Sequence, residues 1–206
     1  MVHTGRMAAP ATAKGEQTRR QILDAGARVF AERGYWGASL NQLIGRHKIT
    51  KGSFYFYFGS KEALALAVFK DLQERTAARL MARAGAAPTP LLQLRSMFIE
   101  RARLNSIEPS VKAISKLCHD LTNHAKIGAE LSSASRLPVL ITRDLLTQAK
   151  AIGEVRPDVD ADAAAEAIVG AVIGFEELSE QTTGGRDFRE RVERFLDMFL
   201  PSLSQV

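Results

Sequence analysis

Apolar residues recur at helical spacing along most of the chain, and no segment alternates apolar and polar residues between hairpin turns. In the first clear segment Ile22, Ala25 and Val29 share one face, which predicts a helix over about residues 16–33 that ends at Gly34. The same periodicity returns to the end of the chain. The sequence therefore predicts an all-α fold.

Two short helices are expected after the first one. Ser39 is a candidate N-cap, and Gln42 three residues later completes the pattern of a capping box. Thr50 is a candidate N-cap of the next helix, in which Phe54 and Phe58 lie four residues apart and point toward the same small core. Two short helices joined by a tight turn can place the second helix in the major groove of DNA.

The remainder of the chain is also predicted to be helical. Helices are expected at about residues 61–84, 91–105, 111–121, 138–152, 160–180 and 187–200, the last stopped by Pro201. Residues 85–90 break the pattern and suit a connection within a second domain. We expect an N-terminal arm (residues 1–14), a three-helix helix-turn-helix domain (residues 15–61) and a C-terminal helical domain (residues 62–206).

Basic residues are concentrated near the N-terminus. Residues 1–61 carry ten Lys and Arg residues against three Asp and Glu residues, whereas the remainder carries 18 and 20. A basic head attracts a polyanion such as double-stranded DNA, although a solvated basic surface explains the charge by itself equally well. The helix-turn-helix pattern inside this head favours DNA.

Composition also limits the environment of the protein. The only cysteine is Cys118, so no disulfide forms within the chain. No apolar run reaches the ~18 residues that a membrane span needs, and the first dozen residues lack the apolar core of a signal peptide. We therefore expect a cytoplasmic protein with no membrane partner.

Five aromatic residues follow one another from Phe54 to Phe58. The alternative interpretation is a packed core helix, but five consecutive aromatic side chains cannot all face one core. If Phe54 and Phe58 are buried, Tyr55 and Phe56 project outward, and an exposed aromatic cluster needs a partner.

A longer signature surrounds these two short helices. It consists of Thr18-Arg19, Ile22-Leu23, Ala25, Phe30, Gly34-Tyr35, Leu40, Ile44, the run from Ile49 to Phe58, and Lys61-Glu62-Ala63-Leu64. With these residues the chain resembles the TetR family of bacterial transcriptional regulators. The resemblance implies a homodimer with an N-terminal helix-turn-helix and a C-terminal ligand-binding and dimerisation domain. Most such proteins repress transcription until a small molecule binds.

The resemblance also implies which residues contact DNA. Matched position by position, the contacts fall on Lys51, Gly52, Ser53, Tyr55, Phe56, Tyr57 and Lys61, with the cap Ser39 near a phosphate. We add the cap Thr50, and Lys48 because its charge is expected near DNA. The chain departs from the family at His47-Lys48-Ile49, where Ala-Gly-Val is usual, and at Tyr57, where histidine is common.

The C-terminal half carries a second signature. It consists of residues 153–160 with Gly174, Leu178-Ser179, Thr183-Gly184, Arg191-Val192 and Leu200-Pro201. With these residues the chain resembles the γ-butyrolactone receptor branch of actinomycetes, which implies a lactone or furan signal as the inducer. That branch often has a tryptophan in the ligand pocket, whereas the only tryptophan here, Trp36, lies in the basic head.

Inward positions of the C-terminal helices are candidates for a ligand pocket, although residues of this kind are more often ordinary core. The candidates are Leu94, Met97, Phe98, Arg101, Ile114, Leu117, Cys118, Leu140, Ile141 and Phe175. The hypothesis is a small-molecule inducer that releases the protein from DNA. A regulator without a ligand, or one whose ligand promotes DNA binding, is the alternative.

Two apolar stripes in the last two helices are candidates for a dimer interface, and the competing use is packing within their own domain. They consist of Ala163, Ala164, Ala167, Ile168, Ala171, Val172 and Phe175, and of Val192, Phe195, Leu196 and Phe199. A dimer places two recognition helices on a pseudo-palindromic operator.

Enzymatic function finds little support in the sequence. Cys118, His119, Asp120 and His124 form the one cluster of reactive side chains, but adjacent residues on a helix point in different directions. We expect no catalytic residue, metal or cofactor. A protein-interaction module without DNA binding does not explain the basic head.

Overall fold

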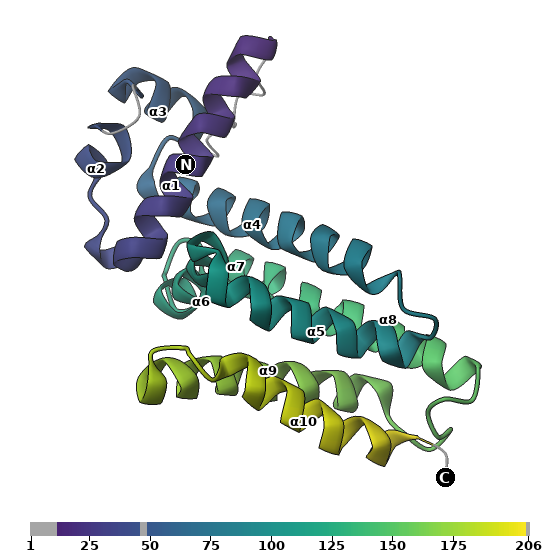
Figure 1. Cartoon of the computed structure of the whole chain (residues 1–206). Helices are drawn as coiled ribbons and strands as arrows, with labels where there is room; N and C mark the ends of the chain where they lie inside the picture. The colour runs from purple at the N-terminus through teal and green to yellow at the C-terminus, as the bar shows by residue number, and fades with distance from the viewer. Residues whose placement is uncertain (1–11, 46–48, 205–206) are drawn as a thin grey trace. The chain divides into compact units, whose positions relative to one another are not determined.

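The computed structural model describes residues 12–45 and 49–204, and helices account for most of them (Figure 1). The helices are α1 (Ala13–Gly37), α2 (Leu40–Gly45), α3 (Lys51–Phe58), α4 (Lys61–Ala84), α5 (Pro90–Ile107), α6 (Pro109–Leu121), α7 (Gly128–Ala134), α8 (Leu137–Ala151), α9 (Ala161–Thr183) and α10 (Phe188–Leu203). Within these two ranges no strand forms, and one isolated bridge joins Val155 and Ser204. The predicted all-α fold is confirmed.

The described residues form two compact units that differ from a simple division of the chain. The first unit contains the residues up to Glu74 and, from further along the chain, Pro109–Ser135. The second contains Arg75–Glu108 and Arg136–Val206, so α4 contributes to both units. The expected functional boundaries at residues 14 and 61 stay predictions, because compactness does not by itself define function.

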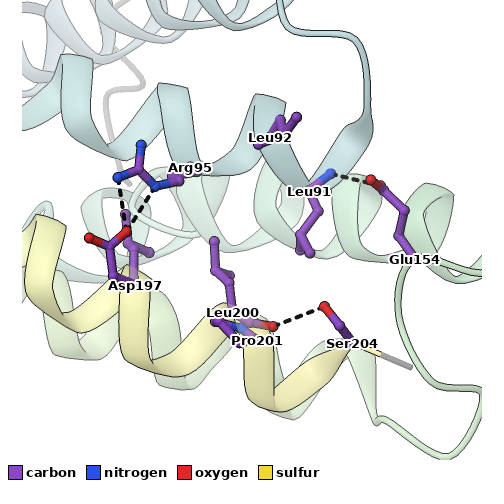
Figure 2. A pocket seen from close by; sticks show the side chains of 9 residues that line it. Leu91, Leu92, Arg95, Glu154, Asp197, Leu200, Pro201 and Ser204 are labelled. Carbon is purple, nitrogen blue, oxygen red and sulfur yellow. Dashed lines mark hydrogen bonds and ion pairs between the residues drawn. The ribbon is translucent and has the colours of Figure 1, made fainter. Parts of the chain in front are cut away.

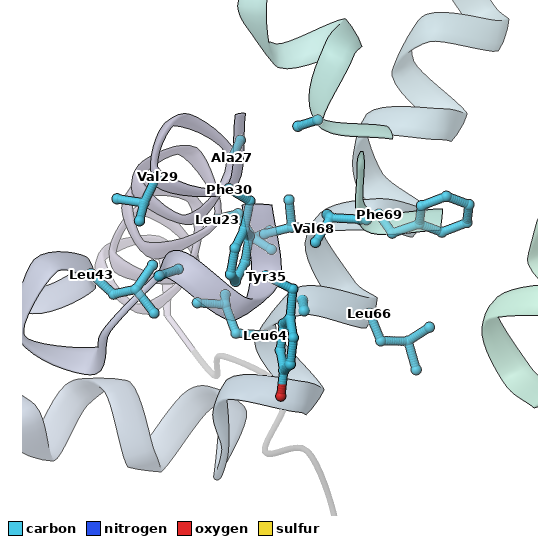
Figure 3. Close-up of a cluster of buried hydrophobic side chains, with 14 of the residues drawn as sticks. Leu23, Ala27, Val29, Phe30, Tyr35, Leu43, Leu64, Leu66, Val68 and Phe69 are labelled. Atoms are coloured by element: carbon cyan, nitrogen blue, oxygen red, sulfur yellow. The ribbon is translucent and has the colours of Figure 1, made fainter. Parts of the chain in front are cut away.

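The core of the first unit collects apolar side chains from its helices, and Figure 3 shows part of it. Phe30 of α1 and Leu64 and Phe69 of α4 are buried almost completely, and Leu117 of α6 belongs to the same cluster. Burying each such side chain contributes about 2 kcal/mol. This core fixes the short helices α2 and α3, whose Leu43, Phe54 and Phe58 enter it.

Helix α1 begins earlier than predicted and is broken where the sequence predicts its end. Thr12 caps it by accepting the backbone N–H of Gly15. At Gly34 the backbone turns to φ 66° and ψ −178°, and helical conformation resumes at Tyr35. A positive φ of this kind favours glycine.

Four helices, α5, α8, α9 and α10, build most of the second unit, with the end of α4. Leu94, Leu145, Ile168 and Leu196, one from each helix, are fully or almost fully buried. A polar contact accompanies them, in which Arg101 Nη2 of α5 lies 3.0 Å from the Glu176 carboxylate of α9.

One expectation about the helices is wrong, and one helix was missed. Pro201 does not stop the last helix, which continues to Leu203. A proline there removes only the N–H that would bond the carbonyl four residues earlier, which a final turn tolerates. Helix α7 was not predicted, because its seven residues are mostly small or polar and show no clear apolar period.

The proposed dimer stripes also need correction. Ala164, Ile168 and Val172 of α9 and Val192 and Leu196 of α10 are buried within their own unit. The competing interpretation, packing within the domain, is therefore right for these residues. The side of α9 that faces solvent does not carry these buried residues.

Candidate nucleic-acid interface

The start of α2 has the predicted capping box. The backbone N–H of Ser39 donates to Gln42 Oε1 at 2.9 Å, and the N–H of Gln42 donates to Ser39 Oγ at 3.3 Å. Each side chain thereby supplies an acceptor near the start of the helix, where N–H groups lack a partner four residues earlier. The pair fixes the direction in which the chain enters the first short helix.

The cap of α3 is equally clear. Thr50 Oγ1 accepts the backbone N–H of Ser53 at 3.0 Å and lies 2.8 Å from Ser53 Oγ. At the other end Gly59 adopts φ 71° and donates its N–H to the Tyr55 carbonyl. The eight residues of α3 are thus held as a helix at both ends.

Helix α3 separates its aromatic residues between two faces. Phe54 and Phe58 are 1% and 4% exposed, whereas Tyr55 and Phe56 are 48% and 63% exposed. The predicted burial of the two phenylalanines is confirmed. Lys51, Gly52 and these two aromatic side chains therefore reach solvent, while Ser53 and Tyr57 are half-buried. Of the other predicted contacts, Ser39 and Thr50 are exposed, and Lys48 lies outside the described residues.

Lys61, at the start of α4, faces the protein. Its ammonium nitrogen lies 4.3 Å from the centre of the Tyr35 ring. Burial lowers the pKa of Lys61, and the charges of Glu62 and Asp120 oppose this effect. The ring and the two carboxylates keep the ammonium group at this position in the absence of DNA.

A hollow of about 430 Å³ lies between the start of α1 and the outer side of α3. Lys14 and Thr18 line it from α1, and Gly52, Phe56 and Tyr57 line it from α3. The sequence analysis missed Lys14 and Thr18, because only the packing of α1 beside α3 brings them to this surface. Their ammonium and hydroxyl groups are suitable donors to phosphate oxygens.

Some basic residues of the head are committed to its own structure. Arg20 of α1 bonds both carboxylate oxygens of Asp71 on α4, at 2.6 and 2.8 Å, and also bonds Asp24. Hydrogen bonds to Asp71 and then Asp24 raise the pKa of Arg20. Arg20 therefore holds α1 on α4, and the uneven charge of the sequence overstates the number of cations that can face DNA.

The ten predicted ligand residues are divided between the two units. Ile114, Leu117 and Cys118 lie on α6 and pack with the core of the first unit. In the second unit Leu94, Met97 and Phe98 are buried, and Arg101, Ile141 and Phe175 are half-buried. Leu140 is 39% exposed, so its predicted inward position is wrong.

The second unit also contains a pocket of about 550 Å³ that the sequence analysis missed (Figure 2). It is lined by Leu91, Leu92, Arg95, Glu154, Leu196, Asp197, Leu200, Pro201 and Ser204, from the start of α5, the segment after α8 and the end of α10. Glu154 accepts the N–H of Leu91, and Arg95 is paired with Asp197. The leucines would accept an apolar molecule of modest size.

Two members of the reactive cluster, Asp120 at the end of α6 and His124 just after it, contact the end of α1. Asp120 accepts the backbone N–H of Tyr35 at 2.7 Å, and the His124 ring lies beside the rings of Tyr35 and Trp36. His119 is exposed. Within the part of the chain that is described, no group of His, Cys, Asp and Glu side chains is arranged to hold a metal ion.

Among the same residues, no helix has the length and apolar character to span a membrane.

Some known proteins resemble only the N-terminal part of the chain, and others resemble nearly all of it. Residues 22–68 match the model of "Bacterial regulatory proteins, tetR family". The A-factor receptor protein of Streptomyces griseus is 30% identical over 93% of this chain, which covers 66% of that receptor's length. The chain spans a third or less of several other curated relatives, including regulators of Bacillus subtilis that match over the head.

Solved structures match over nearly the whole chain. One, described as the molecular basis for control of antibiotic production by bacterial hormones, is 32% identical with a TM-score of 0.79 and covers 92% of this chain and 98% of that one. TylP, a TetR regulator from Streptomyces fradiae, is 32% identical with a TM-score of 0.78, covering 93% and 89%. These relatives are regulators rather than enzymes. The chain belongs to the TetR family of bacterial regulatory proteins.

Proposed function

We propose that this regulator is a dimeric, sequence-specific repressor that inserts α3 into the major groove of a pseudo-palindromic operator. The observation that carries the proposal is the division of α3 into two faces. Phe54 and Phe58 anchor it in the core, while Lys51, Tyr55 and Phe56 reach solvent. A helix held in this way presents polar and aromatic groups to base edges without losing its own packing.

The neighbouring elements suit the DNA backbone on either side of α3. Lys14 and Thr18 of α1 share a hollow with the outer side of α3, and Ser39 caps α2 at an exposed position. Lysine, hydroxyl groups and helix N-termini are the usual donors to phosphates. Lys61 joins them in the proposal by leaving the Tyr35 ring when a phosphate is near.

The dimer interface is proposed on the exposed side of α9. Ala163, Ala167, Gly170 and Gly174 share this side with Ile173, which is 60% exposed. A Cβ atom added to Gly170 or Gly174 would meet no atom within 4 Å, so the backbone there is open to close approach. Small residues let a helix of a second copy cross at short distance.

A small apolar signal is proposed as the inducer. One relative is named as the receptor of A-factor, and the second unit of this chain supplies buried leucines and a pocket of about 550 Å³. A ligand that weakens DNA binding is itself weakened by DNA to the same degree, typically about 5- to 150-fold. Because DNA is the target, the proposal places the protein in the bacterial cytoplasm.

The proposal is tested by selecting bound sequences from a random duplex pool. We expect a two-fold repeated sequence with half-sites about one DNA turn or more apart, and a dimer in sedimentation at micromolar concentration. Gel shifts with lactones, furans and culture extract then test induction. A ligand that binds at saturation without changing operator affinity contradicts release, and enrichment of no sequence contradicts specific DNA binding.

A further inference from the structure

Two side chains of α6 bond the two backbone groups that lose each other as partners at the break in α1. In a continuous helix the N–H of Tyr35 would donate to the carbonyl of Ala31, four residues earlier. At Gly34 the backbone turns away, and two side chains of α6 replace the lost bond. Lys116 Nζ donates to the Ala31 carbonyl at 2.6 Å, and Asp120 Oδ2 accepts the Tyr35 N–H at 2.7 Å.

The two α6 residues are matched to this task. They are four residues apart, so they lie on the same face of α6, and each brings the charge that its partner needs. The break itself is shaped around Asp120: a Cβ atom on Gly34 would lie 2.8 Å from Asp120 Oδ2. Both bonds are partly buried, which makes the loss of one partner costly for the other.

The end of α1 leads directly into the DNA-reading helices. Only Trp36, Gly37 and Ala38 separate Tyr35, which bonds Asp120, from the cap Ser39 of α2. The Tyr35 ring in turn supports the Lys61 ammonium at the start of α4. A displacement of α6 would therefore reach the starts of α2 and α4 through one short segment.

We infer that Asp120 and Lys116 are positioning residues for DNA binding: they fix the broken end of α1 and so set the placement of α2, α3 and Lys61. The inference rests on the proposed DNA-binding function.

The test compares the operator affinities of four variants. Each affinity is measured at a temperature at which circular dichroism shows that the variant is folded, and it is calculated from the fraction of protein that is competent to bind DNA. Asp120→Ala and Lys116→Met should each weaken binding to the selected operator by about 10-fold. Asp120→Asn keeps an acceptor for Tyr35 and should stay within about threefold of the wild type. His119→Ala, at an exposed neighbouring position on α6, should have wild-type affinity.

Amide hydrogen exchange gives a readout that general stability does not move. In Asp120→Ala the amides from Tyr35 to Leu43 should exchange faster, while those from Leu23 to Phe30 keep their protection. Wild-type affinity in both Asp120→Ala and Lys116→Met overturns the inference. So does an Asp120→Asn variant as weak as the alanine variant.

The remaining outcomes are also decisive. If Asp120→Ala does not fold, the test compares Lys116→Met with Lys116→Arg, which keeps a donor. Weaker binding in Lys116→Met alone supports the positioning role, and wild-type binding in both contradicts it. If the wild type binds no DNA sequence, the proposed function fails. In that case unchanged exchange from Tyr35 to Leu43 also overturns the positioning role, and faster exchange supports it independently of DNA.

Discussion

The ammonium nitrogen of Lys61 rests 4.3 Å from the centre of the Tyr35 ring. The family resemblance makes Lys61 a phosphate contact, so this lysine has two competing partners. The contact with the ring holds a long side chain in one place before DNA arrives, and burial there lowers the pKa of Lys61.

We predict that Lys61→Met weakens operator binding and reduces the slope of log affinity against log salt by about 0.9, because one phosphate contact is lost. Filter binding between low and moderate salt measures the slope. Tyr35→Phe, which keeps the ring, serves as the control and should keep the wild-type slope. An unchanged slope in Lys61→Met would mean that the lysine stays on the ring when DNA is bound.

The capping box at α2 predicts a stability effect. Ser39→Ala removes the side-chain acceptor of the Gln42 N–H and should lower the free energy of unfolding by about 1 kcal/mol. Ser39→Asp restores an acceptor and should recover most of the loss. Urea unfolding followed by circular dichroism measures both. Equal stability of Ser39→Ala and the wild type would show that solvent replaces this bond without loss.

Local chemistry made much of the head predictable. The caps Ser39 and Thr50 depend on residues within four positions of each other, and the structure has both. The predicted end of the long helix at Gly34 is a break in the structure, after which α1 continues to Gly37. Asp120 bonds Tyr35 across 85 positions, so no local pattern indicates it. The same limit hid Lys14, which reaches the surface of α3 only through tertiary packing.

The ligand region was less predictable for a related reason. Helical spacing shows which side of a helix faces inward, but not which core that side joins. Leu94 and Leu117 are both fully buried, yet one belongs to the second unit and the other to the first. Leu92, which lines the pocket in Figure 2, is 47% exposed and has no inward signature in the sequence.

A pH effect is expected where α9 meets α10. Asp187 accepts hydrogen bonds from Arg191, Ser179 and Thr183, and these bonds, Arg191 first, hold its pKa well below the ordinary value. A carboxylate with a lowered pKa in the folded state stabilises the fold above its unfolded pKa of about 3.9, and this contribution is lost as the pH falls below it.

We therefore predict that Asp187→Asn is less stable than the wild type at pH 6 and that the difference narrows between about pH 4 and pH 2. Thermal unfolding across this range measures it. Asp158→Asn, at an exposed aspartate, is the matched control. A difference that is constant with pH would assign the effect of Asp187 to packing rather than to its charge.

The dimer face allows a substitution that is harmless in the monomer. Because a Cβ atom on Gly170 meets no atom within 4 Å, Gly170→Leu should fold as well as the wild type and gain helix propensity. In the proposed dimer the same side chain separates the two α9 helices. Sedimentation of Gly170→Leu should show a monomer, whereas Gln148→Leu, at an exposed position of α8, should remain a dimer. A dimeric Gly170→Leu protein would place the interface elsewhere.

The central claim is that the exposed face of α3 reads DNA, and operator affinity of a variant altered only on that face tests it most directly. Lys51→Ala with Tyr55→Ala changes two exposed side chains and leaves Phe54 and Phe58 in the core. Gel shifts with the selected operator should show a folded protein that binds about 100-fold more weakly, with a smaller loss on unrelated DNA. Equal operator affinity of this variant and the wild type would contradict the claim.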